Sequence, residues 1–312
     1  MIESDLTPRL AVAIQPSTTV EGLISYREVL LTLLDLHALH LAPLERIGTM
    51  AEWQHDPRMA RAKGQLEAVF RAHLDAGAVQ VDDAADPVDV VATLRSIARR
   101  DLVPAVYDWL ALTADRAEVA AFLAVEGGPD ADFDDLVALC QVGLAGTPKL
   151  TLAANYWDEM GRGTLSAVHT ELHREMVHAL DLPVVPVDEL PVEALERKVL
   201  GGYLATNRVL QPEMIGALGL LECQAGPRCR KVVTALHRTG ASPSALAFYE
   251  EHAAADPHHG KDWLDHAVVP LLDRFPEWGA RVVRGARWRS TVNQRFFGWT
   301  ASNFGCAGAL AA

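Results

Sequence analysis

Apolar residues recur three and four positions apart along almost the whole of this 312-residue sequence. That spacing gives an α-helix one apolar face, whereas the alternation typical of β-strands bounded by hairpin turns is almost absent. Proline follows a good N-cap residue at Ser242-Pro243 and at Asp256-Pro257, which is typical of helix starts. We therefore predict an all-α fold, in which the second half contains separate helices over 211–223, 227–239, 243–255 and 258–275.

Composition limits the possible partners. Half of the residues are hydrophobic, so the chain can bury a large core. The formal charge is −13 and no basic run occurs, which argues against nucleic acid or an anionic membrane as a partner. Polar residues interrupt the most apolar early window, 29–41, which is too short to span a membrane, and the N-terminus lacks the pattern of a secretory signal. Four scattered cysteines do not form a disulfide framework. We expect a soluble, cytoplasmic protein that recognises a small molecule or another protein.

The chain shows one possible division. Pro43 separates the first 45 residues from the rest, and the pattern is continuous from Glu52 to about Trp299. We expect an N-terminal helical arm over 1–45 and one domain over 46–312.

The run His252-x-x-x-Asp256-x-x-His259 is a candidate metal-binding motif. Spacings of four and three residues place the three side chains on one face of a helix. Imidazole and carboxylate ligands without thiolate suit iron or manganese. Pro257 leaves an alternative open, because Asp256 could instead cap a new helix that exposes His258 and His259 in its first turn. His258 could then substitute for His259.

A second candidate pairs Glu159 with His169 across the break Gly161-Arg162-Gly163. In one straight helix, ten residues would separate the pair by roughly 15 Å, so they can share a metal only if the break bends the chain. The alternative is an exposed acid and a packed histidine.

A third candidate is Glu222, which ends the apolar stretch 215–222. An acid in this position either faces solvent at the end of the stretch or is buried against a metal.

Together these side chains resemble the metal ligands of the haem-oxygenase-like diiron oxidases and oxygenases. The resemblance depends on the order and spacing of three ligand-bearing segments, with 53 positions from His169 to Glu222 and 30 from there to His252. The run Asn-Tyr-Trp-Asp-Glu-Met-Gly-x-Gly at 155–163 is similar to the signature of the branch described as iron-containing redox enzymes. The ligands that the resemblance implies are Glu159, His169, Glu222, His252, Asp256 and His259.

The resemblance implies a bundle of about seven core helices that holds two irons and no haem, uses O2 as cosubstrate, draws electrons from an external donor and forms a homodimer. The ten-residue spacing from Glu159 to His169 is similar to that of a nitrosourea-forming N-oxygenase. N-oxygenation of a small amine or amino-acid-like metabolite in secondary metabolism is therefore the leading expectation. Oxidative C–C cleavage, decarboxylation or desaturation of an amino or fatty acid is the alternative. That N-oxygenase also has an additional upstream carboxylate ligand, for which Glu126, Asp132 and Asp135 are candidates.

Four more residues near the proposed ligands are candidates for substrate binding. Arg162 and Arg230 could bind a substrate carboxylate, and Tyr156 and Trp157 could line the pocket, although surface or core positions are the alternative.

The sequence leaves three other kinds of protein as alternatives. A ferritin-like diiron bundle needs two Glu-x-x-His motifs, and Glu175-x-x-His178 is the one we find. Haem ligation would need an early histidine such as His37, His40 or His55, but single histidines on apolar helices are usually packed residues. A non-catalytic helical interaction protein is the alternative from outside the enzymes.

Overall fold

Helices make up the regular structure of residues 7–15, 25–78, 87–126 and 133–304, the part of the chain that this computed structural model describes, apart from the side chains of residues 87, 88, 256 and 257. No strand occurs in that part, which confirms the predicted all-α class. The α-helices are α1 (Pro8–Ala13), α2 (Tyr26–Leu41), α3 (Leu44–Ile47), α4 (Pro57–Gly77), α5 (Pro87–Arg100), α6 (Ala105–Leu112), α7 (Arg116–Glu126), α8 (Phe133–Cys140), α9 (Thr147–Glu159), α10 (His169–Leu180), α11 (Val192–Ala205), α12 (Gln211–Arg238), α13 (Pro243–Asp262), α14 (Val269–Arg274) and α15 (Gly279–Asn303).

Short helical segments connect several of these helices. The 3-10 helices are η2 (Gly48–His55), η4 (Gly161–Gly163), η5 (Leu165–Ala167), η6 (Val187–Glu189), η7 (Arg208–Leu210) and η9 (Pro276–Trp278). One π-helical segment, η8 (Trp263–Val268), joins α13 to α14.

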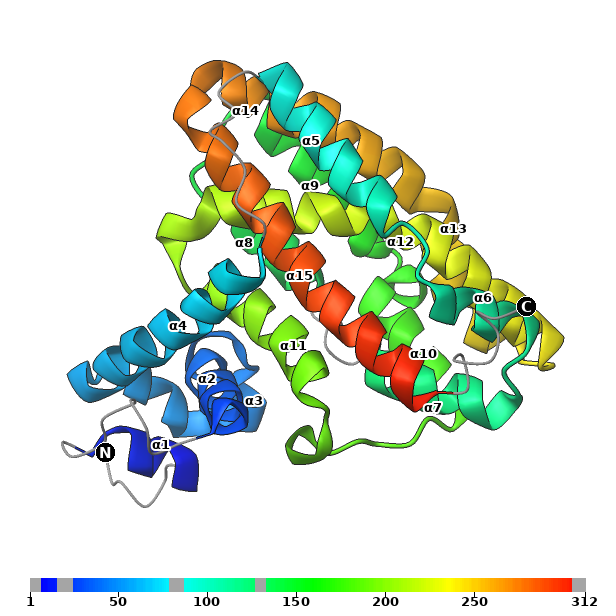
Figure 1. Ribbon diagram of the computed structural model, residues 1–312, viewed down its shortest axis with the longest axis horizontal. Coiled ribbons are helices and arrows are strands. Elements are labelled where there is room, and N and C mark those ends of the chain that lie inside the picture. The colour runs from blue at the N-terminus through cyan, green and yellow to red at the C-terminus, as the bar shows by residue number, and fades with distance from the viewer. Residues whose placement is uncertain (1–6, 16–24, 79–86, 127–132, 305–312) are drawn as a thin grey trace.

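Helix α12 lies at the centre of the arrangement (Figure 1). It packs against α13 along one side, against α15 along another, and against α6. Helix α10 packs on α13, so α10, α12 and α13 form neighbouring walls around one part of the interior. These contacts position the candidate metal ligands, because α10, α12 and α13 each carry at least one of them.

The N-terminal helices lie to one side of this core (Figure 1). Helix α2 begins at a capping box, in which Ser25 and Glu28 satisfy each other's backbone amides, and it buries Leu30, Leu33 and Leu36. It packs against α4 and α11. The apolar face of α2 is therefore covered by later parts of the chain.

Two predicted helix breaks are wrong. Helix α12 continues through Pro227, and α13 continues through Pro257 as far as Asp262. A proline inside a helix leaves the carbonyl four residues earlier without its usual donor. For Pro257 that carbonyl belongs to Ala253, and it accepts a hydrogen bond from Nη1 of Arg230 at 3.2 Å. A side chain from the adjacent helix thus replaces the missing donor and allows α13 to continue.

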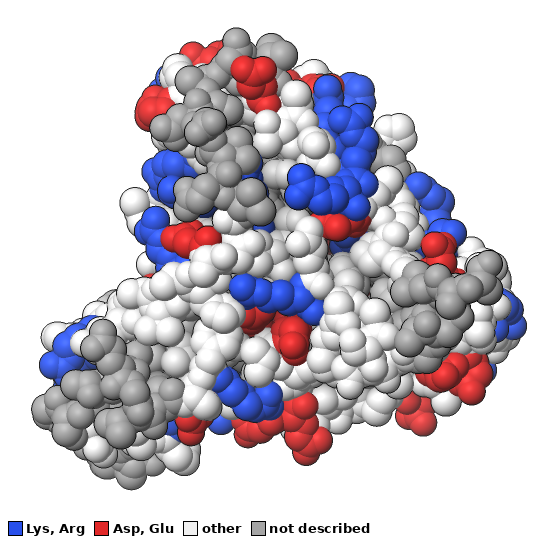
Figure 2. All heavy atoms as spheres, viewed as in Figure 1, with Lys and Arg blue, Asp and Glu red and all other residues white. Residues whose placement is uncertain are grey.

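Acidic and basic side chains are interspersed on the face shown in Figure 2, which has no single large basic field. No helix of the described residues has the length and apolarity to cross a membrane.

Candidate metal centre

The chain reverses direction between α9 and α10, and this reversal brings Glu159 to His169. Gly161, Arg162 and Gly163 all have positive φ, at 58°, 52° and 83°. A Cβ atom on Gly161 would lie 2.4 Å from the backbone carbon of Ala167, so only glycine fits at this close approach. The bend that the Gly-x-Gly run had to supply is therefore present.

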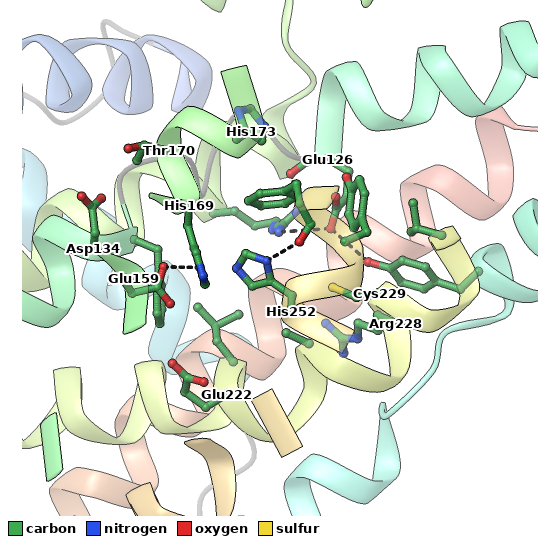
Figure 3. Close-up of a pocket in the computed structure, with 18 residues that line it drawn as sticks. Glu126, Asp134, Glu159, His169, Thr170, His173, Glu222, Arg228, Cys229 and His252 are labelled. Carbon is green, nitrogen blue, oxygen red and sulfur yellow. Dashed lines mark hydrogen bonds and ion pairs between the residues drawn. The ribbon is translucent and has the colours of Figure 1, made fainter. Parts of the chain in front are cut away.

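The first group of candidate ligands consists of Glu159, His169 and His252. Oε2 of Glu159 lies 2.8 Å from Nδ1 of His169, and the rings of His169 and His252 have centroids 4.4 Å apart. Nδ1 of His252 donates to the carbonyl of Phe248 at 2.7 Å, which leaves Nε2 as the nitrogen available to a metal. Figure 3 shows the three side chains pointing toward one another. One potential ligand atom from each lies within 4.8 Å of those from the others.

The second group shares Glu159 and adds Glu222 and His259. Nδ1 of His259 lies 3.5 Å from Oε2 of Glu222, and Nε2 of the same ring lies 2.9 Å from Oδ2 of Asp158. The Asp158 carboxylate accepts from Nε2–H and so directs Nδ1 toward Glu222. Asn155 donates to Oε1 of Glu222 at 2.9 Å and fixes the other side of that carboxylate.

Close contact between α12 and α13 brings Glu222 and His259 together. A Cβ atom on Gly260 would lie 3.0 Å from the backbone of Glu222 and Cys223, tighter than almost all real contacts. Glycine at this position lets α13 approach α12 beside the two ligands. Because α13 is continuous, His252 and His259 lie two turns apart on one face.

The buried glutamates of the described residues fall into two kinds. Each glutamate of the first kind has a Lys or Arg partner: Glu67 pairs with Lys63, Glu196 with Arg295, and Glu213 with Arg281 and Arg284. Glu159 and Glu222, each 3% exposed, have only histidine and asparagine neighbours and no ion pair with Lys or Arg. Since buried carboxylates are costly without a cation, these two are suited to metal ions.

Electrostatics favours the protonation states that bind metal. Burial raises the pKa of Glu159, but its contacts with the neighbouring histidines, His169 above all, outweigh burial and hold this pKa below its usual range. Burial, reinforced by His169, lowers the pKa of His252 to about 4. At neutral pH the site therefore contains an ionised carboxylate and a neutral imidazole, which are the forms that coordinate metal.

The first group of ligands opens on a cavity of about 140 Å³. Its walls come from α6 to α13 and contain both apolar and polar side chains. The residues that line it are Tyr107, Glu126, Phe133, Asp134, Glu159, His169, Thr170, His173, Arg197, Leu221, Glu222, Ala225, Arg228, Cys229, Val232, Phe248, Tyr249 and His252.

Comparison with known protein families matches residues 102–294 to the family described as iron-containing redox enzymes. This chain belongs to that family. The matched residues include both groups of candidate ligands, and membership of the family confirms the expected resemblance and the haem-oxygenase-like helical fold. It also assigns the chain to the oxidoreductases. No curated protein matches the chain.

The remaining ligand predictions have different outcomes. His258 is exposed, whereas His259 belongs to the second group of candidate ligands. Pro257 therefore does not cause His258 to replace His259. The side chain of Asp256 and the whole of Asp132 lie outside the described residues. Glu126 lines the cavity away from both groups, where it accepts from the Tyr107 hydroxyl at 3.0 Å.

Two further acids lie close together on α8, where Asp135 is exposed and Asp134 lines the cavity. Burial, with the neighbouring Asp135, raises the pKa of Asp134. Asp134 and Glu126 are therefore the upstream acids that line the cavity among the described residues.

The four residues expected to bind substrate lie outside the wall of this cavity. Arg162 is exposed and donates a hydrogen bond to Asp158 at 2.6 Å. Arg230 donates a hydrogen bond to the carbonyl of Ala253. Tyr156 packs against the core, and Trp157 is 54% exposed. Proximity in sequence misled here, because residues next to a ligand on a helix point to other faces.

Sequence reasoning missed several residues of the site. Asp158 and Asn155 flank Glu159 in the same signature run, so the run itself was the available signal. The signal for Arg228 was weaker. Arg228 lies six positions after Glu222, and we expected the helix to break between them at Pro227.

Proposed function

We propose that this protein is a non-haem diiron enzyme that uses O2 to oxidise a small amine or amino-acid-like metabolite. One observation carries the proposal: two groups of buried and half-buried ligands share Glu159, and neither of their glutamates has a Lys or Arg partner among the described residues. Two cations held by these residues would neutralise the cluster.

The ligand atoms fit two iron ions. Glu159, His169 and His252 would hold one ion, and Glu159, Glu222 and His259 would hold the other. The His169 ring is buried, and its Nδ1 lies 2.8 Å from Glu159, whereas its Nε2 makes no hydrogen bond within the described residues. A buried imidazole in that state is suited to coordinate a metal. Asp134 lines the same cavity, where the charge of Glu159 acts on it, and it is our candidate for the additional upstream carboxylate.

When bound, the two irons would supply the electrons that reduce O2. The chain itself fixes the ligands and shields the reaction from water. The carbonyl of Phe248 and the carboxylate of Asp158 accept hydrogen bonds from His252 and His259 and so set which ring nitrogens face the centre. Leu221, Val232 and Phe248 form an apolar wall that limits the entry of water.

N-oxygenation is the reaction we favour, supported by the ten-residue spacing of Glu159 and His169 and by Asp134 at the cavity. In its net reaction one oxygen atom enters an N–H bond to form a hydroxylamine. The other oxygen atom leaves as water, with two electrons and two protons from an external donor. Oxidative C–C cleavage, decarboxylation or desaturation by the same cofactor is the second candidate. Its support is the apolar wall, which also suits a carbon chain. The homodimer, the cytoplasmic location and the identity of the electron donor remain predictions.

Oxygen uptake tests the proposal. Iron-loaded protein with a chemical reductant should consume O2 faster when a suitable amine is present, and mass spectrometry should detect a product 16 Da heavier. Glu159→Ala should abolish both signals. Protein that binds two irons but shows no oxygen uptake with any of a broad panel of amines and amino acids would contradict the proposal.

A further inference from the structure

The end of the cavity away from Glu159 contains a buried cation. Arg228 is 6% exposed and lines the cavity (Figure 3). No ion pair joins its guanidinium to a carboxylate within the described residues. The neighbouring acid, Glu126, instead receives the Tyr107 hydroxyl at 3.0 Å and lies 3.9 Å from Arg197. Two buried cations, Arg197 and Arg228, therefore lie near the single carboxylate of Glu126, and Arg228 makes no direct ion pair with it within the described residues.

The guanidinium of Arg228 is held rigidly but is not saturated. Nε donates to the carbonyl of Leu102 at 3.1 Å, and Nη2 donates to the carbonyl of Asp101 at 2.6 Å and to Gln224 at 2.9 Å. Its planar group also lies over the Phe297 ring at 5.0 Å. Nη1 makes no hydrogen bond within the described residues. Buried charged groups are rarely left in this state, because an unpaired charge loses its hydration without compensation.

We propose that Arg228 binds a carboxylate of the substrate and so determines which small molecules the cavity accepts. The substrate class is a small amino-acid-like molecule with one carboxylate, anchored by that acid group at Arg228, whose short chain carries its amine at the far end. What happens at the other end of that molecule depends on the function proposed above, whereas the binding of the acid group does not. Guanidinium is suited to this task because it presents donors in a plane that matches a carboxylate.

The cavity wall fits such a molecule. Six residues separate Glu222 from Arg228 on α12, a rise of roughly 9 Å along the helix. The small and apolar residues of the cavity wall include Leu221, Ala225, Cys229, Val232 and Phe248. An acid group at Arg228 would therefore place the far end of a chain of a few carbons beside the candidate metal ligands.

Binding of hexanoate and of its uncharged analogue hexanamide tests the proposal by isothermal titration calorimetry on the full-length protein. The measurement is made on metal-free protein and on anaerobic Fe(II)-loaded protein. Wild type should bind hexanoate at least about tenfold more tightly than hexanamide in both states, because charge-assisted hydrogen bonds favour the acid. Equal affinities for the two compounds, or no binding of hexanoate, would overturn the proposal without any substitution.

Two variants locate the effect. Arg228→Gln should lose the preference for hexanoate, and Arg228→Lys, which keeps the charge, should retain part of it. Arg238→Gln is the matched control. Arg238 also lies on α12 and donates to backbone carbonyls, those of Leu110 and Ala111, but it does not line the cavity. It should keep the full preference. Unchanged hexanoate affinity in folded Arg228→Gln, checked by thermal unfolding, would reject the assignment.

The two states separate this proposal from the proposed function. Protein that binds no iron but prefers hexanoate through Arg228 would refute the diiron function and support the acid site. Protein that binds two irons but shows equal affinity for the acid and the amide would support the diiron function and refute the acid site.

Discussion

Two buried Glu–His pairs in this protein have opposite surroundings. In the pair between α2 and α4, Glu67 contacts Nε2 of His37 at 3.0 Å, Nζ of Lys63 at 2.8 Å and Nδ2 of Asn207 at 2.8 Å. In the pair between α9 and α10, Glu159 contacts His169 at 2.8 Å and has no Lys or Arg partner. The first carboxylate is neutralised by the protein, and the second is not. The same two residue types are therefore neutralised by a protein cation in one place and, in the other, suited to bind a metal cation.

The largest expected difference between the pairs is in iron binding. Glu159→Ala should reduce the iron content from about two per chain to nearly none, because both ligand groups use this carboxylate. Glu67→Ala should leave the iron content unchanged. Metal analysis after anaerobic Fe(II) loading and gel filtration measures both variants. Two irons retained in Glu159→Ala would remove the distinction between the pairs.

Single ligands of the two groups should have an intermediate effect. His252→Ala and Glu222→Ala should each lose about one iron while remaining folded, because each belongs to one group only. Circular dichroism checks the fold, and the same metal analysis gives the stoichiometry. Either variant retaining both metals would show that the groups are assigned incorrectly.

Replacing a buried glutamate by glutamine should change the stability of the metal-free protein in opposite directions at Glu222 and at Glu67. Glu222→Gln removes a buried charge that lacks a Lys or Arg partner, keeps the acceptor for Asn155, and should raise Tm by about 2 to 4 °C. Glu67→Gln removes the counter-charge of Lys63 and should lower Tm by about 4 to 8 °C. Differential scanning calorimetry compares the two variants. A lower Tm in both would mean that Glu222 is stabilised in the metal-free state.

The smallest effect should be a pH dependence at the first pair. Burial lowers the pKa of His37 despite the hydrogen bond with Glu67, so the folded protein keeps this ring neutral. The unfolded chain takes up the proton near pH 6.5, and stability should therefore fall as the pH drops below that value. The contribution is at most about 1.4 kcal/mol per pH unit.

Urea unfolding of metal-free protein between pH 7.5 and 5.5 measures this slope. His37→Gln should show a shallower slope than wild type, and His55→Gln, at an exposed position, should not. Identical slopes in wild type and His37→Gln would contradict the neutral assignment.

The same comparison shows what the sequence could predict. Helical periodicity and the spacing of Glu159, His169, Glu222 and His252 were sufficient for the fold class and for the order of the ligand helices. The Gly161 turn was predictable because the ligands could converge only through a bend. The continuity of α13 was not predictable, because the donor that compensates Pro257 comes from Arg230 on another helix.

Residues around the cavity were harder to predict than the ligands. The face on which Arg228, Asp134 or Trp157 lies depends on helix rotation, which tertiary packing sets. The presence or absence of Lys or Arg near a buried glutamate is likewise a tertiary property. The difference between Glu67 and Glu159 was therefore not visible in the sequence.

Iron stoichiometry of the wild-type protein tests the central claim most directly. Metal-free protein is loaded with Fe(II) under anaerobic conditions, separated from free iron, and analysed for iron per chain. The shared Glu159 and the two groups around it predict two irons per chain. A single bound iron would contradict a shared carboxylate, and no bound iron would mean that the buried cluster is not a metal centre.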